Sequence, residues 1–405
     1  MTPSTCPFCG LLCDDLPGNG PATGQCALAE RLFQVPATAP ALIDGVPSDT
    51  ASAVARAARL LARARRPLVG GLACDVTGQR AALDLAERLG GVLDTMNSTA
   101  QFRNLLAYQD GGWMSTTLSE VRNRADVILL AGTTASRFPR FRERLLAGES
   151  QFGPTARRLL ALGMPEGAAP EWLTEPPIPC PPDRLGQVFS ALRTRLAGRP
   201  LGMSTVAGLP VARLDALLET LLAARYGVLA WNAADLDFPQ ADLTVRALLD
   251  LVIDLNARTR WAGLPLGGND GDASAVQTCA WRTGYPSRVA FEAAGPRYEP
   301  IRFAGEGLLA AGEADALVWI SAFDPARTPP PADCPVIVLG RADMAFTTPP
   351  AVFIPVAVPG VQQAGFLHRM DGVVALPLAA PAPGGPPGVA ETLTAIMKEL
   401  DHAAA

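Results

Sequence analysis

The chain has 405 residues, of which 49% are hydrophobic, so it is long enough to bury a large core and to form two or three domains. Charged residues make up 18% of the chain, and the formal net charge is -5 at pH 7. This balance supplies no basic surface for a phosphate backbone, which disfavours nucleic acid as a partner.

The amino terminus shows no positively charged segment followed by an apolar stretch, so we expect no secretory signal. The apolar run Val127–Gly132 is far shorter than the roughly 18 residues that a membrane span needs. Eight cysteines are too few for a disulfide scaffold in a chain of this length, and half of them lie within the first 26 residues. These features predict a cytoplasmic protein with no membrane partner and a metal-binding amino-terminal segment.

From residue 48 onward, segments with helical spacing of apolar residues alternate with short apolar runs that are typical of strands. Such alternation predicts an α/β fold with parallel sheets covered on both faces. The first expected elements are a helix at 53–61 capped by Asp49 or Thr50, a strand at 68–72, a helix at 81–89, a strand at 92–96, a helix at 118–124, a strand at 126–131 and a helix at 141–146.

Between Met164 and Asp183 the sequence is rich in proline, which favours an irregular crossover between two lobes. The elements expected beyond it are helices at 185–196, 211–225, 241–255 and 389–400, and strands at 227–231, 316–321, 335–339 and 352–356. The last three strands indicate a return to the sheet of the first lobe. We therefore expect a Cys-rich head at 1–47, a first α/β lobe at 48–163, a second α/β lobe at 164–310, and return strands with a C-terminal helix at 311–405.

Cys6, Cys9, Cys13 and Cys26 follow the pattern C-x2-C-x3-C-x12-C. Four thiolates suit soft or borderline metals, and the first three can wrap one face of a metal centre while the fourth closes it. The spacing differs from the paired CxxC knuckles usual for structural zinc and is typical of cysteine ligation of a cubane iron–sulfur cluster. Three interpretations stay open, namely a 4Fe–4S cluster, a zinc ion, and reduced thiols without metal.

The remaining candidate residues have weaker patterns. The chain has two histidines, His368 and His402, and a lone His368 is more often structural than catalytic. The segment Gly267–Asp272 lacks the P-loop lysine and the EF-hand glutamate, so we interpret it as a turn before a helix. A group of arginines and tyrosines is a candidate polar pocket for an anionic carrier, with interface or loop packing as the alternative. Its members are Arg282, Tyr285, Arg297, Tyr298 and Arg302.

Three separate stretches resemble one family. They are Cys6–Asp15, Trp281–Pro286 with Arg297–Tyr298 downstream, and Val352–Pro355 leading into Arg369–Val373. On these residues the chain resembles the B subunit of formylmethanofuran dehydrogenase, a relative of molybdopterin-dependent formate dehydrogenases. The resemblance covers nearly the whole chain, and it implies Rossmann-like parallel-sheet lobes of the molybdopterin oxidoreductase type with a small Cys-rich head.

The resemblance also implies a cofactor set that this chain does not fully match. In the family, the amino-terminal cysteines hold a 4Fe–4S cluster, and a Cys or selenocysteine in the first lobe binds the molybdenum or tungsten of a pterin. The matching region, Asp94–Asn104 with Gly111–Arg124, contains neither Cys nor His, and Cys26–Ala29 lacks the lysine that usually stands beside the cluster. We therefore expect no catalytic residue, no molybdenum or tungsten pterin, and loss of the chain's own redox activity.

With these departures, the chain resembles the degenerate B subunit of the bacterial formyltransferase/hydrolase complex. That complex also contains an amidohydrolase-like A subunit, a β-helical C subunit and a formyltransferase D subunit. The resemblance implies that this chain takes part in one-carbon metabolism, in a complex that moves a formyl group from formyl-tetrahydromethanopterin to a methanofuran-like carrier and hydrolyses it to formate. The leading hypothesis is a non-catalytic structural subunit of that complex. The competing hypotheses are an active formylmethanofuran or formate dehydrogenase subunit with a 4Fe–4S cluster and a metal pterin, and a structural-zinc interaction protein.

Overall fold

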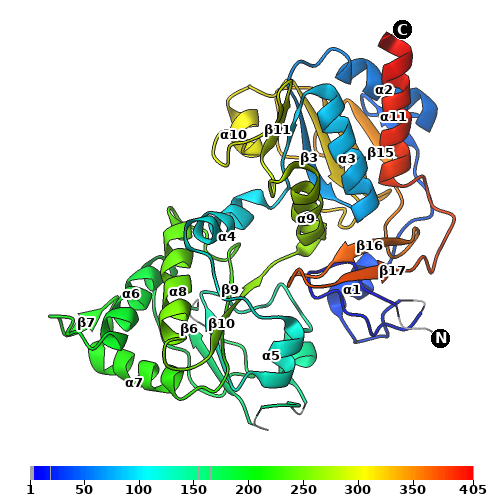
Figure 1. Cartoon of the computed structure of the whole chain (residues 1–405). Helices are drawn as coiled ribbons and strands as arrows, with labels where there is room; N and C mark the ends of the chain where they lie inside the picture. Colours follow the sequence, from blue (N-terminus) through cyan, green and yellow to red (C-terminus); the bar gives the residue numbers. More distant parts are fainter. Residues whose placement is uncertain (1–3, 19, 149, 154–155, 165–166, 405) are drawn as a thin grey trace. The chain divides into compact units, whose positions relative to one another are not determined.

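The structure is a computed structural model that describes residues 4–18, 20–148, 150–153, 156–164 and 167–404. The chain divides into two compact units (Figure 1). Unit 1 consists of Met1–Ser98 and Gly268–Ala405, and unit 2 consists of Thr99–Gly267.

Unit 1 is built on a nine-stranded sheet of order β12-β11-β4-β3-β13-β14-β15-β1-β2. Its five central strands, β4 to β15 in that order, are parallel, and antiparallel strands flank them on both edges. The strands of unit 1 are β1 (Ala41–Ile43), β2 (Val46–Ser48), β3 (Pro67–Ala73), β4 (Val92–Leu93), β11 (Val289–Glu292), β12 (Gly295–Tyr298), β13 (Ala316–Ser321), β14 (Val336–Gly340), β15 (Val352–Pro355), and the separate hairpin β16 (Gly365–His368) and β17 (Ala375–Leu378).

Local sequence signals set the ends of the helices of unit 1. The carboxylate of Asp49 accepts a hydrogen bond from the Ser52 amide at 2.8 Å, which caps the second helix. Gly90 ends the third helix with a φ of 61°, a conformation that glycine adopts without strain. The helices are α1 (Ala27–Leu32), α2 (Thr50–Leu61), α3 (Val76–Leu89), α9 (Asp272–Thr283), α10 (Gly305–Ala310) and α11 (Val389–Ala404), with a 3-10 turn at Asn269–Gly271.

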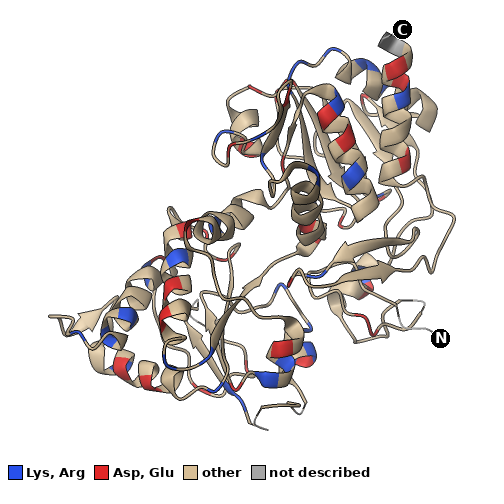
Figure 2. Ribbon diagram, in the orientation of Figure 1, with Lys and Arg blue, Asp and Glu red and all other residues tan. Residues whose placement is uncertain are grey.

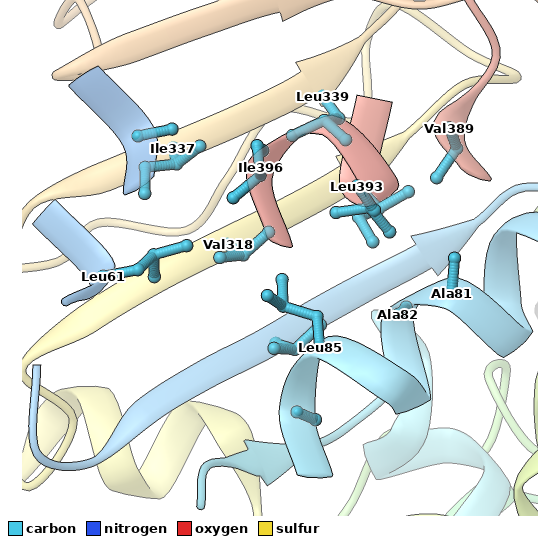
Figure 3. Close-up of a cluster of buried hydrophobic side chains, with 14 of the residues drawn as sticks. Leu61, Ala81, Ala82, Leu85, Val318, Ile337, Leu339, Val389, Leu393 and Ile396 are labelled. Carbon is cyan, nitrogen blue, oxygen red and sulfur yellow. The ribbon is translucent and has the colours of Figure 1, made fainter. Parts of the chain in front are cut away.

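The main core of unit 1 lies between one face of the sheet and helices α2, α3 and α11. Figure 3 shows Leu85 of α3 and Leu393 of α11 beside Val318 of β13, and all three side chains are fully buried. Burial of a leucine side chain of this kind contributes about 1.5–3 kcal/mol. The opposite face of the sheet carries a smaller cluster that includes Leu68, Phe303 and Leu317.

Unit 2 contains a four-stranded parallel sheet of order β10-β9-β5-β6. The indole rings of Trp231 and Trp261 are fully buried in its core, and Trp261 donates a hydrogen bond to the Leu221 carbonyl at 2.9 Å. The remaining elements of the chain are α4 (Ser98–Gly111), α5 (Leu118–Arg124), β5 (Val127–Ala131), a π-helix (Arg142–Leu146), β6 (Arg158–Leu162), a 3-10 turn (Pro182–Arg184), α6 (Leu185–Leu196), β7 (Thr205–Val206), β8 (Leu209–Pro210), α7 (Val211–Leu222), β9 (Gly227–Asn232), α8 (Ala241–Leu255) and β10 (Trp261–Leu266).

The α/β class with parallel sheets is confirmed, but the units divide differently from the expected lobes. Strand β5, which was expected in the lobe at 48–163, is hydrogen-bonded to β9 over five residue pairs. The proline-rich stretch from 164 to 183 therefore connects two elements of unit 2, and Ile178 extends the edge of β6 through its amide and carbonyl groups. The expected head at 1–47 is also not separate from the sheet. It contains β1 and most of β2, and both strands belong to the large sheet of unit 1.

Charges of both signs share the outer surfaces of the helices, as Figure 2 shows for α3 and α8. On α8, Arg246 contacts Asp250 at 2.8 Å, and the partners lie four residues apart on one helix face. Within the described residues, no helix is both long enough and apolar enough to cross a lipid bilayer.

Candidate functional site

The four amino-terminal cysteines lie in a short looped segment of unit 1. Ser4 and Leu16 exchange two backbone hydrogen bonds, of 2.9 and 3.2 Å, and inside this bridge the Cys6 amide donates to the Cys13 carbonyl at 2.8 Å. Leu12 adopts a φ of 43° and donates to the Cys9 carbonyl at 3.1 Å. The chain thus folds back on itself, which gathers the first three cysteines into one loop.

The head packs firmly on the rest of unit 1. Phe8 makes an edge-to-face contact with Phe323, which follows β13, with ring centroids 6.5 Å apart. Arg341, which follows β14, is almost completely buried and donates to the carbonyls of Leu32 at 2.8 Å and Gln34 at 2.9 Å. Because these carbonyls lie at and just after the end of α1, Arg341 holds the chain just beyond the fourth cysteine.

These four cysteines are not joined in disulfides, and the first three are buried. Burial raises the pKa of the Cys6 thiol well above its usual range, and the neighbouring Cys9, Cys13 and Cys26 raise it further. Metal binding requires thiolates, whose charge a cation would have to balance. Within the described parts of the chain, no group of three or more His, Cys, Asp or Glu side chains is arranged to hold a metal ion. The role of Cys6, Cys9, Cys13 and Cys26 as metal ligands stays a prediction.

A cavity of about 200 Å³ lies on the sheet face of unit 1 that α10 covers. Its lining comes from β3, β13, the segment after β4, α10 and the loop after β13. The chain order along the sheet reverses between β3 and β13, because β4 lies on one side of β3 while β13, β14 and β15 follow on the other. Ligands in open α/β sheets bind beyond the carboxyl ends of strands at such a reversal.

Asp94, the first residue after β4, is the most heavily hydrogen-bonded side chain beside this cavity. Its carboxylate accepts from the Gly305 amide at 2.8 Å, from the Ser98 hydroxyl at 2.7 Å and from the Ser287 hydroxyl at 3.0 Å. The guanidinium of Arg288 lies 3.6 Å away. Burial raises the pKa of Asp94, while Arg288 and the hydrogen bonds oppose that rise. Its oxygens are therefore occupied in joining separate segments of unit 1.

A second polar group lies three residues further along the chain. The Asn97 amide nitrogen donates to Asp270 at 3.1 Å and to Asp272 at 2.5 Å, and its oxygen accepts from Arg327. Arg327 also pairs with Asp270 at 3.2 Å. Asp272 is buried, and its Oδ1 atom has no hydrogen-bond partner among the described residues. Burial, followed by repulsion from Asp270, raises the pKa of Asp272 well above its usual range.

The other residues singled out from the sequence have structural surroundings. His368 is buried against Trp281, with ring centroids 5.1 Å apart, and burial lowers its pKa, which favours the neutral imidazole. In the expected anion pocket, Arg282 pairs with Asp84 at 2.7 Å, and Arg297 pairs with Glu292 and Glu299 at 3.3 and 3.1 Å.

The two tyrosines and the glycine-rich segment singled out from the sequence also have defined surroundings. Tyr285 and Tyr298 stack at 5.1 Å with nearly parallel rings. Of the segment Gly267–Asp272, interpreted from the sequence as a turn before a helix, Asn269–Gly271 forms a 3-10 turn and Asp272 begins α9. Gly268, Asp270 and Gly271 all have positive φ. Asn269 accepts a hydrogen bond from the Gly10 amide at 3.0 Å, so this turn contacts the cysteine loop. No local pattern in the sequence gives a hint of that distant partner.

Unit 1 therefore defines an α/β protein with a mixed sheet that is parallel at its centre, a cysteine loop packed against it, and a polar cluster of Asp, Asn and Arg side chains after β4. No protein-family model matches the chain. It is 32% identical over 368 residues to the B subunit of the formyltransferase/hydrolase complex Fhc of Methylorubrum extorquens, a match that covers 89% of this chain and 96% of that protein. It is 30% identical over 395 residues to the B subunit of the tungsten-containing formylmethanofuran dehydrogenase 2 of Methanocaldococcus jannaschii, covering 91% of each chain.

A solved structure agrees with these relatives. The X-ray crystal structure of the formyltransferase/hydrolase complex (FhcABCD) from Methylorubrum extorquens in complex with methylofuran contains a chain that matches with a TM-score of 0.75 and 31% identity. The match covers 90% of this chain and 99% of that chain. The chain belongs to the family of formylmethanofuran dehydrogenase B subunits, which confirms the resemblance seen in its sequence.

Proposed function

We propose that the chain is a non-catalytic structural subunit of a formyltransferase/hydrolase complex that converts formyl-tetrahydromethanopterin to formate through a methanofuran-like carrier. The observation that carries this proposal is the match to the Fhc B subunit over 96% of that protein, together with the match to a chain of the methylofuran-bound complex. Its partners would be the amidohydrolase-like A subunit, the β-helical C subunit and the formyltransferase D subunit.

The chemistry of the region after β4 supports a non-catalytic role. Residues 94–124 contain no Cys and no His, so they offer neither a thiolate for a redox metal nor an imidazole for proton transfer. Asp94 is engaged by two hydroxyls, a backbone amide and Arg288, and Asn97 is engaged by two carboxylates. These contacts support a role for Asp94 and Asn97 in holding unit 1 together.

The alternative is an active dehydrogenase subunit with a 4Fe–4S cluster and a molybdenum or tungsten pterin. The similarity to a tungsten-containing relative, at 30% identity, is the observation on its side. It would require a metal ligand outside residues 94–124, and Cys74 is a poor candidate because it is fully buried and burial raises its pKa well above the usual range.

The cysteine head and the location of the protein complete the proposal. We propose Rossmann-like lobes of the molybdopterin oxidoreductase type with a Cys-rich head whose Cys6, Cys9, Cys13 and Cys26 descend from a cluster site. A 4Fe–4S cluster, zinc and metal-free thiols give three different metal contents, and none of them takes part in the proposed function. The cytoplasmic location expected from the sequence stays part of this proposal.

The test is to purify the chain from its native host with its bound partners, and to measure iron, zinc, molybdenum and tungsten per chain together with the identity of the subunits. We expect a formyltransferase and an amidohydrolase-like protein to co-purify, without molybdenum or tungsten. About one molybdenum or tungsten atom per chain would overturn the proposal in favour of the dehydrogenase. Iron at about four atoms per chain, zinc at about one, or neither, would decide the content of the head.

A further inference from the structure

The cavity beside Asp94 has a bare floor made by two glycines of β3. A Cβ atom on Gly70 would lie 3.4 Å from the Trp319 ring, and one on Gly71 would lie 2.4 Å from the Ile320 carbonyl oxygen. Gly71 also has a φ of 82°, at the point where the register between β3 and β13 shifts. Glycine is required at Gly71, and the lack of a side chain at both positions leaves the backbone of β3 and the side chain of Trp319 to line the cavity.

Arg327 is the one lysine or arginine among the described residues that line the cavity. Its backbone is fixed by a turn in which its amide donates to the Asp324 carbonyl at 3.1 Å. Its own carbonyl accepts from the Trp319 indole nitrogen at 2.9 Å, which ties the arginine to the aromatic wall.

The guanidinium of Arg327 is held on one side only. Its Nε lies 3.2 Å from the Met96 sulfur, and its Nη2 contacts Asn97 and Asp270. The Nη1 atom has no hydrogen-bond partner among the described residues, and the side chain is 39% exposed. A guanidinium whose position is fixed by two of its nitrogens presents the third as a preorganised donor for an anion.

Asp270 contacts the Nη2 atom of Arg327 at 3.2 Å and shares its charge, and the lining itself adds two acidic residues, Asp94 and Glu306. The carboxylate of Asp94 is buried and occupied by five partners, namely the amides of Thr95 and Gly305, the hydroxyls of Ser98 and Ser287, and Arg288, and Glu306 is exposed. Apolar contact is available from Leu309 and from Trp319. The cavity thus joins a flat apolar wall to a single cationic donor, which is the combination that a planar organic anion requires.

We propose that this cavity binds a small planar organic carboxylate, with its ring against Trp319 and its carboxylate on the Nη1 atom of Arg327. The volume of about 200 Å³ suits a single ring with its substituents and excludes a dinucleotide. This binding site is additional to the proposed structural role, and it does not depend on a metal or on the identity of the partner subunits.

The experiment uses the full chain and two probes, benzoate and its uncharged analogue benzamide. Ligand-observed NMR and quenching of tryptophan fluorescence follow the titration. We expect saturable benzoate binding with a Kd between about 10 μM and about 10 mM, in keeping with a ligand of this size, and at least about tenfold weaker binding of benzamide. No saturable benzoate binding at about 10 mM, or equal binding of benzamide, would overturn the proposal.

Two variants locate the site. Arg327→Gln removes the donor, and Ala326→Trp adds bulk at an exposed lining position without removing a core side chain. Both should weaken benzoate binding at least about tenfold, which is about the effect of losing one charged hydrogen bond. Arg80→Gln, on the exposed surface of α3, is the matched control and should bind like the natural chain. Unchanged binding in both cavity variants, with melting temperatures near that of the natural chain, would place benzoate elsewhere and reject the site.

Discussion

The carboxylate of Asp94 lies 3.6 Å from the guanidinium of Arg288, and both side chains are almost fully buried in unit 1. Arg288 also donates to the Ser98 hydroxyl at 3.1 Å and to the Pro300 carbonyl at 2.5 Å. The pair joins the segment after β4 to the segment before β11, which are nearly two hundred residues apart in the chain. A buried pair of this kind destabilises strongly when one partner is lost, because the other charge stays buried without compensation.

Arg288→Met tests this pair. The substitution removes the guanidinium and leaves the Asp94 carboxylate in a buried site, so we expect the free energy of unfolding to fall by about 3–5 kcal/mol in urea titrations. Arg302→Met, at an exposed position of the same unit, is the control and should change stability by less than about 0.5 kcal/mol. A loss below about 1 kcal/mol for Arg288→Met would mean that the other hydrogen bonds of Asp94 suffice.

Much of the secondary structure of this chain can be read from local patterns. The expected helix at 241–255 and strand at 316–321 coincide with α8 and β13, because α8 has apolar residues at helical spacing and β13 is a short continuous apolar run. Helix α4 was missed, since apolar residues in Ser98–Gly111 do not recur at helical spacing. The segment at 141–146 forms a π-helix, which no sequence period distinguishes from an α-helix.

The candidate site was less predictable because it depends on contacts between distant segments. The four cysteines stood out by their spacing, but the cavity residues Gly70, Trp319 and Arg327 belong to two distant parts of the chain, β3 and β13 with the loop after it, and follow no motif. The proline-rich stretch did not predict the boundary between the two units, because proline marks irregular backbone and does not specify which strands pair. Strand order is set by tertiary packing and not by any one segment.

Leu85→Ala probes the core between α3 and α11. The side chain is fully buried and lies among the residues drawn in Figure 3. Removal of its methyl groups should reduce the free energy of unfolding by about 2–5 kcal/mol, through lost apolar burial and the cavity left behind. Ile301→Ala is the matched control, because Ile301 is 83% exposed, and it should be close to neutral. Equal effects of the two substitutions in urea titrations would contradict the packing described for this face.

Asp272 makes stability depend on pH in a defined direction. Burial and Asp270 raise its pKa in the folded chain, so the folded state holds this proton more tightly than the unfolded state. Stability therefore falls as the pH rises from the ordinary aspartate pKa of 3.8 toward the raised value. Asp272→Asn removes this titration and can still accept the Asn97 hydrogen bond through its carbonyl.

We expect the Asp272→Asn variant to gain stability relative to the natural chain as the pH rises, by on the order of 1 kcal/mol near neutrality. Urea titrations at several values between about pH 4 and pH 8 measure the difference. Asp94 and Asp75, whose pKa values are also raised by burial, remain in both proteins, so the difference in slope reports on Asp272. Parallel pH profiles for the two proteins would show that Asp272 does not retain its proton on folding.

Arg341 should control how firmly the cysteine head is attached. Its side chain is 1% exposed and donates to the carbonyls of Leu32, Gln34 and Phe323, at 2.8 to 3.1 Å. Arg341→Met leaves these carbonyls without a donor, which should cost about 3–5 kcal/mol and open the chain around residues 20–40 to proteases.

Arg31→Met is the matched control. Arg31 pairs with Asp324 at 3.2 Å but is 54% exposed, so its loss should cost at most about 1 kcal/mol. If limited proteolysis cut both variants equally fast near the head, the packing of Phe8 and Leu16 would be sufficient to hold it, and the buried guanidinium would not be what attaches the loop.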